Sequence, residues 1–416
     1  MTVDQMLRSQ VAHLLDAGAV RTHFQPIVDL YDDRVVAYEA LSRGPDGPFA
    51  APQPLFAAAR AGGLLAEVDD LCRRNAVSAA VEAGMAGPLT LFVNVEPDVV
   101  DSERFDDFAS LAERVPGRLR LVLEVTERAL AARPAELLAA VGELRRKGWR
   151  IALDDVGADD LSLAFMPLLR PDVVKLDLRL VQQRPGPAAA HIMTATNAYT
   201  EQTGAVLLAE GIETARHLTI ARALGARFGQ GFLFGRAAPE LTRKRRTGSL
   251  QLHVAAPPSP PASPFDCIPP EAAMRVSPKS LLVEISKHLE REAAALGPSA
   301  IIASTLQEAR HFSEITRARY TELADKLGFV ALIGEGLGSE PVAGVRGANL
   351  DPADPVRQEW DVVVLAPHFA GALLARDLGD TGPDASRRFR FALTYRRDAV
   401  VAAMHVLLDR VAPAPS

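Results

Sequence analysis

Residues 151–160 read IALDDVGADD, and this stretch decides how the chain folds. Three apolar residues lead directly into Asp154 and Asp155. Two adjacent carboxylates at the end of a hydrophobic strand repel each other and lose solvation energy, so they require a neighbouring cation. The stretch therefore predicts a strand that delivers charged side chains to a site.

Similar apolar, β-rich runs recur through the first part of the chain and alternate with alanine- and leucine-rich helical stretches. Strands that are apolar on both faces and separated by helices indicate a parallel sheet covered by helices. About eight such units in about 240 residues favour an α/β fold of the (β/α)8 TIM-barrel type. A doubly wound sheet would open with a glycine-rich turn, and none follows the first strand. The clearest runs are residues 34–41, 89–95, 119–125, 150–156, 172–178 and 205–212.

A proline-rich segment divides the chain. Residues 253–274 contain clustered prolines, which favour an extended linker because proline cannot donate to helix or sheet ladders. We predict a barrel domain over residues 1–240, a linker over 241–274 and a smaller α/β (α+β) domain over 275–416.

Composition narrows the function classes. The net charge of −6 gives no electrostatic reason to expect a nucleic-acid polymer as partner. Two cysteines, in different halves of the chain, exclude a cysteine-based zinc site and a disulfide framework and suit a reducing compartment. No apolar run approaches the roughly 20 residues of a membrane span. We expect a cytoplasmic protein.

Polar side chains close most of the predicted strands. In a parallel barrel these strand ends open on one face, which carries the active site of barrel enzymes. A single acid after a strand is more often a helix N-cap, but that interpretation weakens when successive strands end in this way. The residues concerned are Glu39, Asn94, Glu124, Asp154, Lys175, Asp177, Glu210 and Gln230.

Converging carboxylates raise one another's pKa unless a cation neutralises them. Oxygen ligands without histidine or cysteine point to Mg²⁺ or Mn²⁺. Because Asp154 and Asp155 are neighbours, they could serve two metals, an arrangement that suits in-line hydrolysis of a phosphodiester. Lys175 would orient the attacking water or neutralise a phosphate oxygen. The alternative for this lysine is a solubilising residue at a strand edge.

Eight short motifs lie at these strand ends in a defined order. They are Gln25-Pro26-Ile27, Glu39-Ala40-Leu41, FVNV with Asn94, Glu124-Val125-Thr126-Glu127, Asp154-Asp155, Lys175-Leu176-Asp177, Glu210-Gly211-Ile212-Glu213 and Gln230-Gly231-Phe232. Over roughly residues 5–240 the sequence resembles the EAL family of cyclic-di-GMP phosphodiesterases. The resemblance implies hydrolysis of cyclic-di-GMP to linear pGpG at a two-metal site.

The resemblance also implies a role for each matched position. The first metal would be held by Glu39, Asn94, Glu124 and Asp154, and the second by Asp155 with Asp177 and Glu210 close by. Lys175 would hold the attacking water, with support from Glu213. The dinucleotide would be contacted by Gln25, Arg43 and Gln230.

The loop after the aspartate pair departs from the family. Members commonly read DDFGTG, whereas this chain reads DDVGAD. In the family this loop helps to position the second metal, pairs with the glutamate that matches Glu127, and often contributes to a homodimer. Without a hydroxyl at Ala158, the usual anchor for Glu127 is missing. The alternative is therefore a barrel of weak or no activity that acts as a cyclic-di-GMP receptor. A metal-dependent barrel enzyme that stabilises an enolate is a more remote alternative.

The C-terminal part, over about residues 275–412, resembles the DICT sensory domain. The resemblance rests on three stretches, residues 313–337, 360–379 and 389–410, and on their order. It implies a regulatory domain that responds to a ligand or partner which the sequence does not identify.

Overall fold

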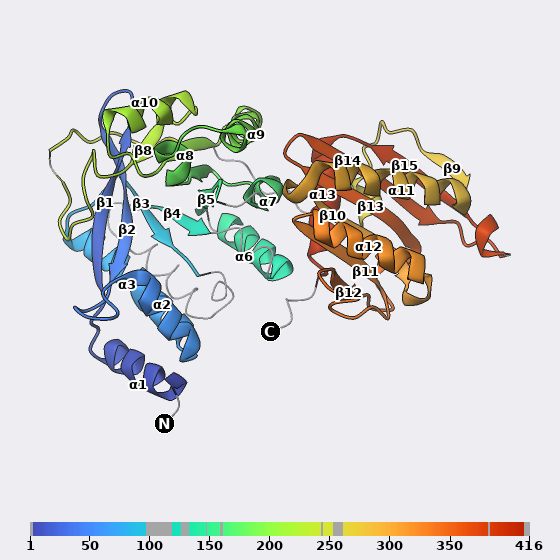
Figure 1. Ribbon diagram of the computed structural model, residues 1–416, viewed down its shortest axis with the longest axis horizontal. Coiled ribbons are helices and arrows are strands. Elements are labelled where there is room, and N and C mark those ends of the chain that lie inside the picture. The colour runs from blue at the N-terminus through green and yellow to red at the C-terminus, as the bar shows by residue number, and fades with distance from the viewer. Residues whose placement is uncertain are drawn as a thin grey trace. The chain divides into compact units, whose positions relative to one another are not determined.

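The computed structural model describes residues 3–96, 119–125, 133–146, 148–158, 161–242, 244–252, 261–381 and 383–411. Contacts divide the chain into two compact units, which are described separately. The first unit contains a closed barrel, and the second contains an open sheet of seven strands (Figure 1).

Eight strands close the barrel in chain order, which confirms the predicted α/β barrel. Neighbouring strands from β2 to β8 are parallel, as the apolar runs predicted. The strands are β1 (Arg21–Asp29), β2 (Val35–Arg43), β3 (Thr90–Asn94), β4 (Arg120–Val125), β5 (Arg150–Val156), β6 (Val173–Leu176), β7 (Val206–Ala209) and β8 (Phe228–Gln230).

Strand β1 departs from a regular (β/α)8 barrel. It runs antiparallel to both of its neighbours, β2 and β8. The cause is local, because only five residues separate β1 from β2 and a parallel pair needs a crossover of a dozen or more. The Asp29 carboxylate organises this turn by accepting hydrogen bonds from the backbone N–H groups of Tyr31 and Asp32.

Helices accompany the barrel strands. The first three share an apolar core in which Val11, Leu55 and Val68 are fully buried. Within the described residues, none of the helices combines the length and the apolar character that crossing a membrane requires. In chain order the helices are α1 (Val3–Asp16), α2 (Pro52–Ala61), α3 (Leu65–Glu82), α6 (Pro134–Arg146), α7 (Leu161–Leu169), α8 (Leu178–Gln182), α9 (Pro187–Thr203) and α10 (Ala215–Ala223). Contacts assign α7 and the larger part of α6 to the second unit.

Each barrel strand contributes an apolar side chain to one buried cluster. Leu250, from the segment that follows the barrel, packs into the same cluster. Thr247 forms a β-bridge with Val35, so the chain stays associated with the barrel beyond residue 240. The strand members are Ile27, Ala37, Phe92, Val122, Ala152, Val173, Leu208 and Phe228. We call this cluster the apolar layer.

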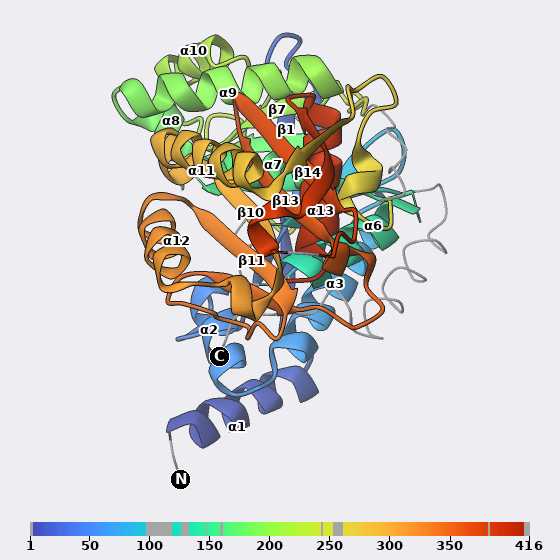
Figure 2. The same cartoon turned by 90° about the vertical axis from the view of Figure 1, so that its right-hand side faces the viewer.

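The second unit is a mixed sheet with helices on both faces (Figure 2). Helices α11 and α12 share one core with alternate residues of the central strands, and α13 contacts β13 and β14 without joining that core. The strand order is β12 (Arg346–Asn349), β11 (Phe329–Glu335), β10 (Ile301–Glu308), β13 (Glu359–Ala366), β14 (Phe369–Asp377), β15 (Arg388–Thr394) and β9 (Arg275–Pro278). The helices are α11 (Lys279–Leu296), α12 (Glu314–Lys326) and α13 (Arg397–Leu408).

A glycine at the end of β8 yields a stability prediction. A Cβ atom at Gly231 would collide with the backbone of Ile212, and its φ of 152° disfavours other residues. We expect Gly231→Ala to lower the free energy of unfolding by about 2–3 kcal/mol. Urea unfolding measures the change.

The matched control is Gly142→Ala inside α6, where the added methyl would meet none of the described residues within 4 Å. It should stabilise by about 0.5–1 kcal/mol. Equal unfolding midpoints for the two variants would contradict the packing argument.

Candidate active site

A polar layer lies directly above the apolar layer. Side chains alternate along a strand, so the residue two positions further on points to the same side. Two positions beyond its member of the apolar layer, each strand is followed by a polar residue. These polar residues lie toward the end of the barrel at which β2 to β8 finish, and we call this end the mouth. For the antiparallel β1 the step runs backwards along the chain. The residues are Gln25, Glu39, Asn94, Glu124, Asp154, Lys175, Glu210 and Gln230.

A bulge in β5 brings the two adjacent aspartates together. The pairing of β5 with β6 shifts between Leu153 and Val156, so Asp154 and Asp155 stand opposite the single residue Lys175. Asp155 has a φ of 54°, a conformation uncommon outside glycine. Neighbours in a regular strand point to opposite faces, and a bulge re-aims one of them. Carboxylate oxygens of Asp154, Asp155 and Glu210 consequently lie within 4.8 Å of one another.

Lys175 is the central cation of the polar layer. Its side chain is 1% exposed. The Nζ atom lies 2.7 Å from Glu124 Oε1, 2.8 Å from Glu210 Oε1, 2.9 Å from Asp154 Oδ1 and 3.7 Å from Glu39 Oε1. This position excludes the alternative of a solubilising strand-edge lysine. One ammonium faces four carboxylates, so negative charge is left in excess.

The excess charge shifts the ionisation of the cluster. Burial, reinforced by the charge of Glu39, raises the pKa of Glu124 well above its ordinary value. Burial also raises the pKa of Glu210 to about 8, although Lys175 opposes the rise. For Lys175, burial alone would lower the pKa, but the surrounding carboxylates outweigh it and raise the pKa well above its usual range. A divalent cation would relieve this repulsion.

Glu39 is positioned by a chain of amides. Gln230 Nε2 donates to Glu39 Oε2 at 2.6 Å and to Gln25 Oε1 at 2.9 Å. Asn94 Nδ2 donates to Glu39 Oε1 at 3.2 Å, which leaves the Asn94 Oδ1 atom suited to a cation. Burial would raise the pKa of Glu39, but Lys175 and these amide donors together lower it below its ordinary value. Glu39 therefore favours the charged form that a metal requires.

The donor set fits a hard divalent cation. Among the described residues, Asp154, Asp155 and Glu210 form the one group of three potential ligands close enough to share an ion. Carboxylate and amide oxygens suit Mg²⁺ or Mn²⁺. The arrangement can therefore support metal-assisted attack of water on a phosphodiester.

Comparison with known families decides the identity of the barrel. The EAL domain matches residues 8–237, more than half of the chain. The chain belongs to the EAL domain family. Residues 267–378 match DICT, the sensory domain in diguanylate cyclases and two-component systems. Both predicted resemblances are thus confirmed.

Relatives of this EAL protein are distant. It is 28% identical over 249 residues to the cyclic di-GMP phosphodiesterase NbdA of Pseudomonas aeruginosa, covering 57% of this chain and 31% of that protein. It is 28% identical over 229 residues to the uncharacterised EAL-domain protein YkuI of Bacillus subtilis, covering 53% and 55%. The chain therefore spans about half or less of the length of these relatives.

A solved structure has the same barrel fold. The EAL enzyme Bd1971, in a form bound to cAMP and cyclic-di-GMP, aligns with a TM-score of 0.51 and 21% identity. The alignment covers 56% of this chain and 66% of that one.

Apart from Asp155 on the bulge, three of the described residues that the sequence predicted for the EAL site lie outside the polar layer. Asp177 caps α8 and accepts two hydrogen bonds at 2.8 Å from the backbone N and the Nε of Arg179. Glu213 is exposed, and its backbone N–H donates to His217 Nδ1. Arg43 ends β2, four residues beyond Glu39. Glu127 lies outside the described residues. The predicted roles of these four remain predictions.

Sequence reasoning missed a buried pair beside the polar layer. Arg73 is fully buried, and its Nε donates to Asp69 Oδ2 at 2.6 Å. Asp69 also accepts the backbone N–H of Glu96, and burial raises its pKa to about 6. The pair lines a cavity of about 320 Å³ that also borders Glu39 and Glu124. The sequence did contain one signal for this pair, an acid and an arginine four residues apart on α3, because that spacing makes two side chains neighbours on a helix.

The lysine-centred cluster yields a stability prediction. Lys175→Met keeps the apolar stem but removes the cation, so in EDTA the variant should lose about 3–5 kcal/mol of unfolding free energy. Mn²⁺ should raise the melting temperature more in this variant than in the wild type. Thermal and urea unfolding with EDTA or Mn²⁺ measure both effects.

Lys287→Met is the matched control, because Lys287 pairs with Glu284 on the exposed surface of α11. It should cost at most about 1 kcal/mol. The cluster account fails if the two lysine variants have the same stability in EDTA.

Proposed function

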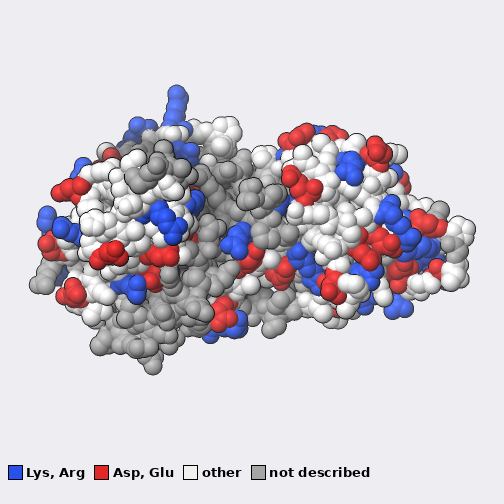
Figure 3. Space-filling view, turned by 90° about the horizontal axis from the view of Figure 1, so that it is seen from below, with Lys and Arg blue, Asp and Glu red and all other residues white. Residues whose placement is uncertain are grey.

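We propose that this protein hydrolyses cyclic-di-GMP to linear pGpG in a reaction that depends on divalent metal. The main observation in support of this proposal is the polar layer, in which Lys175 is surrounded by four carboxylates at the barrel mouth. Membership of the EAL family and the distant similarity to NbdA support the proposal. Figure 3 adds that acidic and basic side chains are interspersed on the face it displays, which gives no support for a nucleic-acid polymer as partner.

We assign the metal ligands to residues of the polar layer and to the nearby Asp155 and Asp177. Two ions, Mg²⁺ or Mn²⁺, would lower the pKa of water and offset the negative charge that develops on the phosphate. The first would be held by Glu39, Asn94, Glu124 and Asp154. The second would be held by Asp155, with Glu210 and Asp177 nearby.

The remaining residues would bind and orient the reactants. Lys175 would donate from Nζ to the attacking water, and its carboxylate partners Glu124 and Glu210 would hold the ammonium in one position. Arg43 would supply a positive charge for the substrate's phosphate. Gln25 and Gln230 would contact the dinucleotide, while Glu213 and Glu127 would support the lysine and the loop after β5.

The second candidate is a cyclic-di-GMP receptor with little or no turnover. The observation that favours it is the loop after β5, where Val156 is buried in the barrel wall and Ala158 lacks a hydroxyl. A homodimer through this loop remains a prediction, because residues 159–160 lie outside the described part of the chain. The DICT match supports regulation of the barrel by the C-terminal domain.

An isosteric variant separates the enzyme from the receptor. Asp155 is exposed, so Asp155→Asn should fold normally, and we expect it to lower turnover by about a hundredfold because a metal ligand is weakened. The matched control, Asp32→Asn in the turn between β1 and β2, should leave turnover unchanged. Chromatography of pGpG formed with Mg²⁺ or Mn²⁺ measures both.

Tight binding of cyclic-di-GMP with no pGpG under either metal would establish the receptor instead. The same assay on residues 1–252 tests regulation. A rate equal to that of the full chain would contradict it.

A further inference from the structure

The buried ion pair on α3 lies beside the residues proposed for the first metal. Asp69 is 1% exposed and Arg73 is fully buried, and Arg73 Nε donates to Asp69 Oδ2 at 2.6 Å. Both residues line the cavity of about 320 Å³ whose wall also includes Glu39, Asn94 and Glu124. The pair is therefore close enough to the polar layer to influence its geometry.

Burial of this pair calls for a role other than stability. Taking two charges out of water is costly, and well-packed apolar residues of similar volume often give equal or greater stability. A buried pair can instead specify the geometry of a neighbouring segment. Arg73 holds one carboxylate oxygen of Asp69, and the other oxygen, Oδ1, accepts the backbone N–H of Glu96 at 3.1 Å. The segment that this carboxylate fixes is therefore the one that contains Glu96.

Glu96 lies two residues beyond Asn94, the last residue of β3. Between them, the backbone N–H of Val95 donates to the carbonyl oxygen of Glu124 at 3.1 Å. The Glu96 side chain accepts a further hydrogen bond from Arg60 of α2 at 2.8 Å. The chain directly after Asn94 is thus attached to β4, to α2 and, through Asp69, to α3.

The Asn94 amide depends on where this strand end lies. Its side chain is exposed, whereas those of Glu39 and Glu124 are buried, so packing constrains it less than those two proposed ligands. Its Nδ2 atom donates to Glu39 Oε1 at 3.2 Å, at the long end of the range for such bonds. A shift of the strand end would weaken this bond and displace the Asn94 Oδ1 atom.

We propose that Asp69, held in place by Arg73, is a positioning residue for the first metal ion and acts through Asn94. Its carboxylate fixes Glu96 and thereby the strand end that carries the Asn94 amide. This inference rests on the proposed metal-dependent function, in which Asn94 Oδ1 binds the ion. It gives a role at the metal site to a residue on a helix outside the barrel strands.

Two double variants of the full chain differ only in the acceptor at position 69. Asp69→Leu with Arg73→Met replaces the ion pair by apolar side chains, which allows folding, and removes the acceptor for the Glu96 N–H. Asp69→Asn with Arg73→Met also removes the ion pair but keeps an oxygen acceptor. We expect the first variant to bind one Mn²⁺ ion about tenfold more weakly than the wild type, and the second to bind it within about twofold. Electron paramagnetic resonance during an Mn²⁺ titration measures these affinities.

The matched control is Asp172→Asn at the opposite end of the barrel. Asp172 directly precedes β6 and is also buried, accepts the backbone N–H of Ile151 at 2.9 Å and pairs with Arg145. The change should lower the urea midpoint in EDTA but leave the Mn²⁺ affinity unchanged. Weakening equal to that caused by Asp69→Leu with Arg73→Met would overturn the inference, because that result indicates a general loss of stability.

A test of the route through Asn94 uses Asn94→Ala as the starting protein. Adding Asp69→Leu and Arg73→Met should then cause no further loss of Mn²⁺ affinity, because the residue through which they act is already absent. A further tenfold loss would overturn the inference.

Reciprocity provides a test on the wild type that requires no variant to fold. If the bond between Glu96 and Asp69 favours metal binding, bound metal stabilises that bond by the same factor. Hydrogen exchange of the Glu96 amide should therefore slow by about tenfold when Mg²⁺ is added. An unchanged exchange rate would overturn the inference.

The Mn²⁺ titration also separates this inference from the proposed function. Equal affinities of the two double variants, with a tight Mn²⁺ site in the wild type, would overturn the role of Asp69 and leave the proposed function intact. The lack of a tight Mn²⁺ site in the wild type would overturn both.

Discussion

The buried ammonium of Lys175 is the constraint on which the barrel mouth depends. Four carboxylates from β2, β4, β5 and the end of β7 approach one Nζ atom, three of them within 2.9 Å. Taking these charges out of water costs several kcal/mol per ion, so the strands must hold them in close register. The apolar layer one step below provides that register, because each polar side chain follows an apolar one by two positions on the same strand. Removing either layer would leave the other without support.

Much of this site was predictable from the order of residues. Strand ends marked by a polar residue after an apolar run indicated that Glu39, Glu124, Asp154 and Lys175 would meet, and in the structure they do. The bulge that aims both aspartates at the mouth was not predictable, because it depends on the pairing of β5 with β6 and on the unusual φ of Asp155. The antiparallel β1 was also missed. Its five-residue turn was the available signal, since it is too short for a crossover.

The positions of some other side chains could not be predicted from the order of residues in the sequence. Asp177 follows an apolar strand just as Glu210 does, yet its carboxylate caps α8 and binds Arg179. Whether an acid after a strand joins the polar layer or caps the next helix depends on the path of the next few residues. The order of the motifs does not encode that path. The buried Arg73–Asp69 pair was missed for a related reason, because spacing on a helix does not reveal which face is covered.

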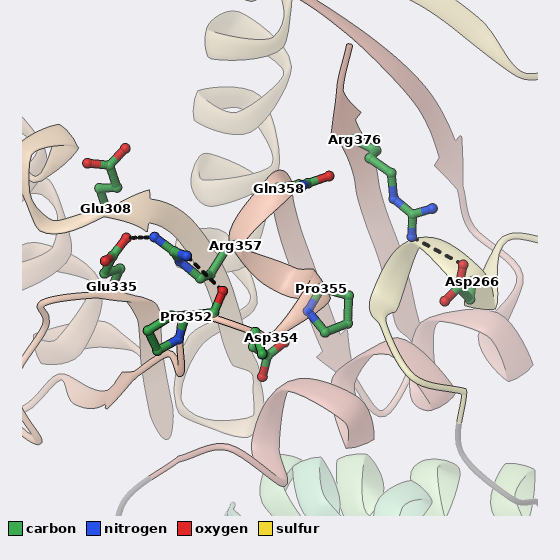
Figure 4. A pocket seen from close by; sticks show the side chains of 10 residues that line it. Asp266, Glu308, Glu335, Pro352, Asp354, Pro355, Arg357, Gln358 and Arg376 are labelled. Atoms are coloured by element: carbon green, nitrogen blue, oxygen red, sulfur yellow. Dashed lines mark hydrogen bonds and ion pairs between the residues drawn. The ribbon is translucent and has the colours of Figure 1, made fainter. Parts of the chain in front are cut away.

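The two units use acidic side chains in different ways. At the barrel mouth, carboxylates converge within reach of a single ion, which favours hard divalent cations. In the second unit, Glu335 and Asp266 are instead each paired with an arginine, Arg357 and Arg376 (Figure 4). The most direct test of the central account is the number of Mn²⁺ ions that the protein binds, measured by electron paramagnetic resonance during a titration. The account predicts two ions per chain in the wild type and one in Asp155→Asn. Equal stoichiometry in the two proteins, or no tight Mn²⁺ site in either, would contradict it.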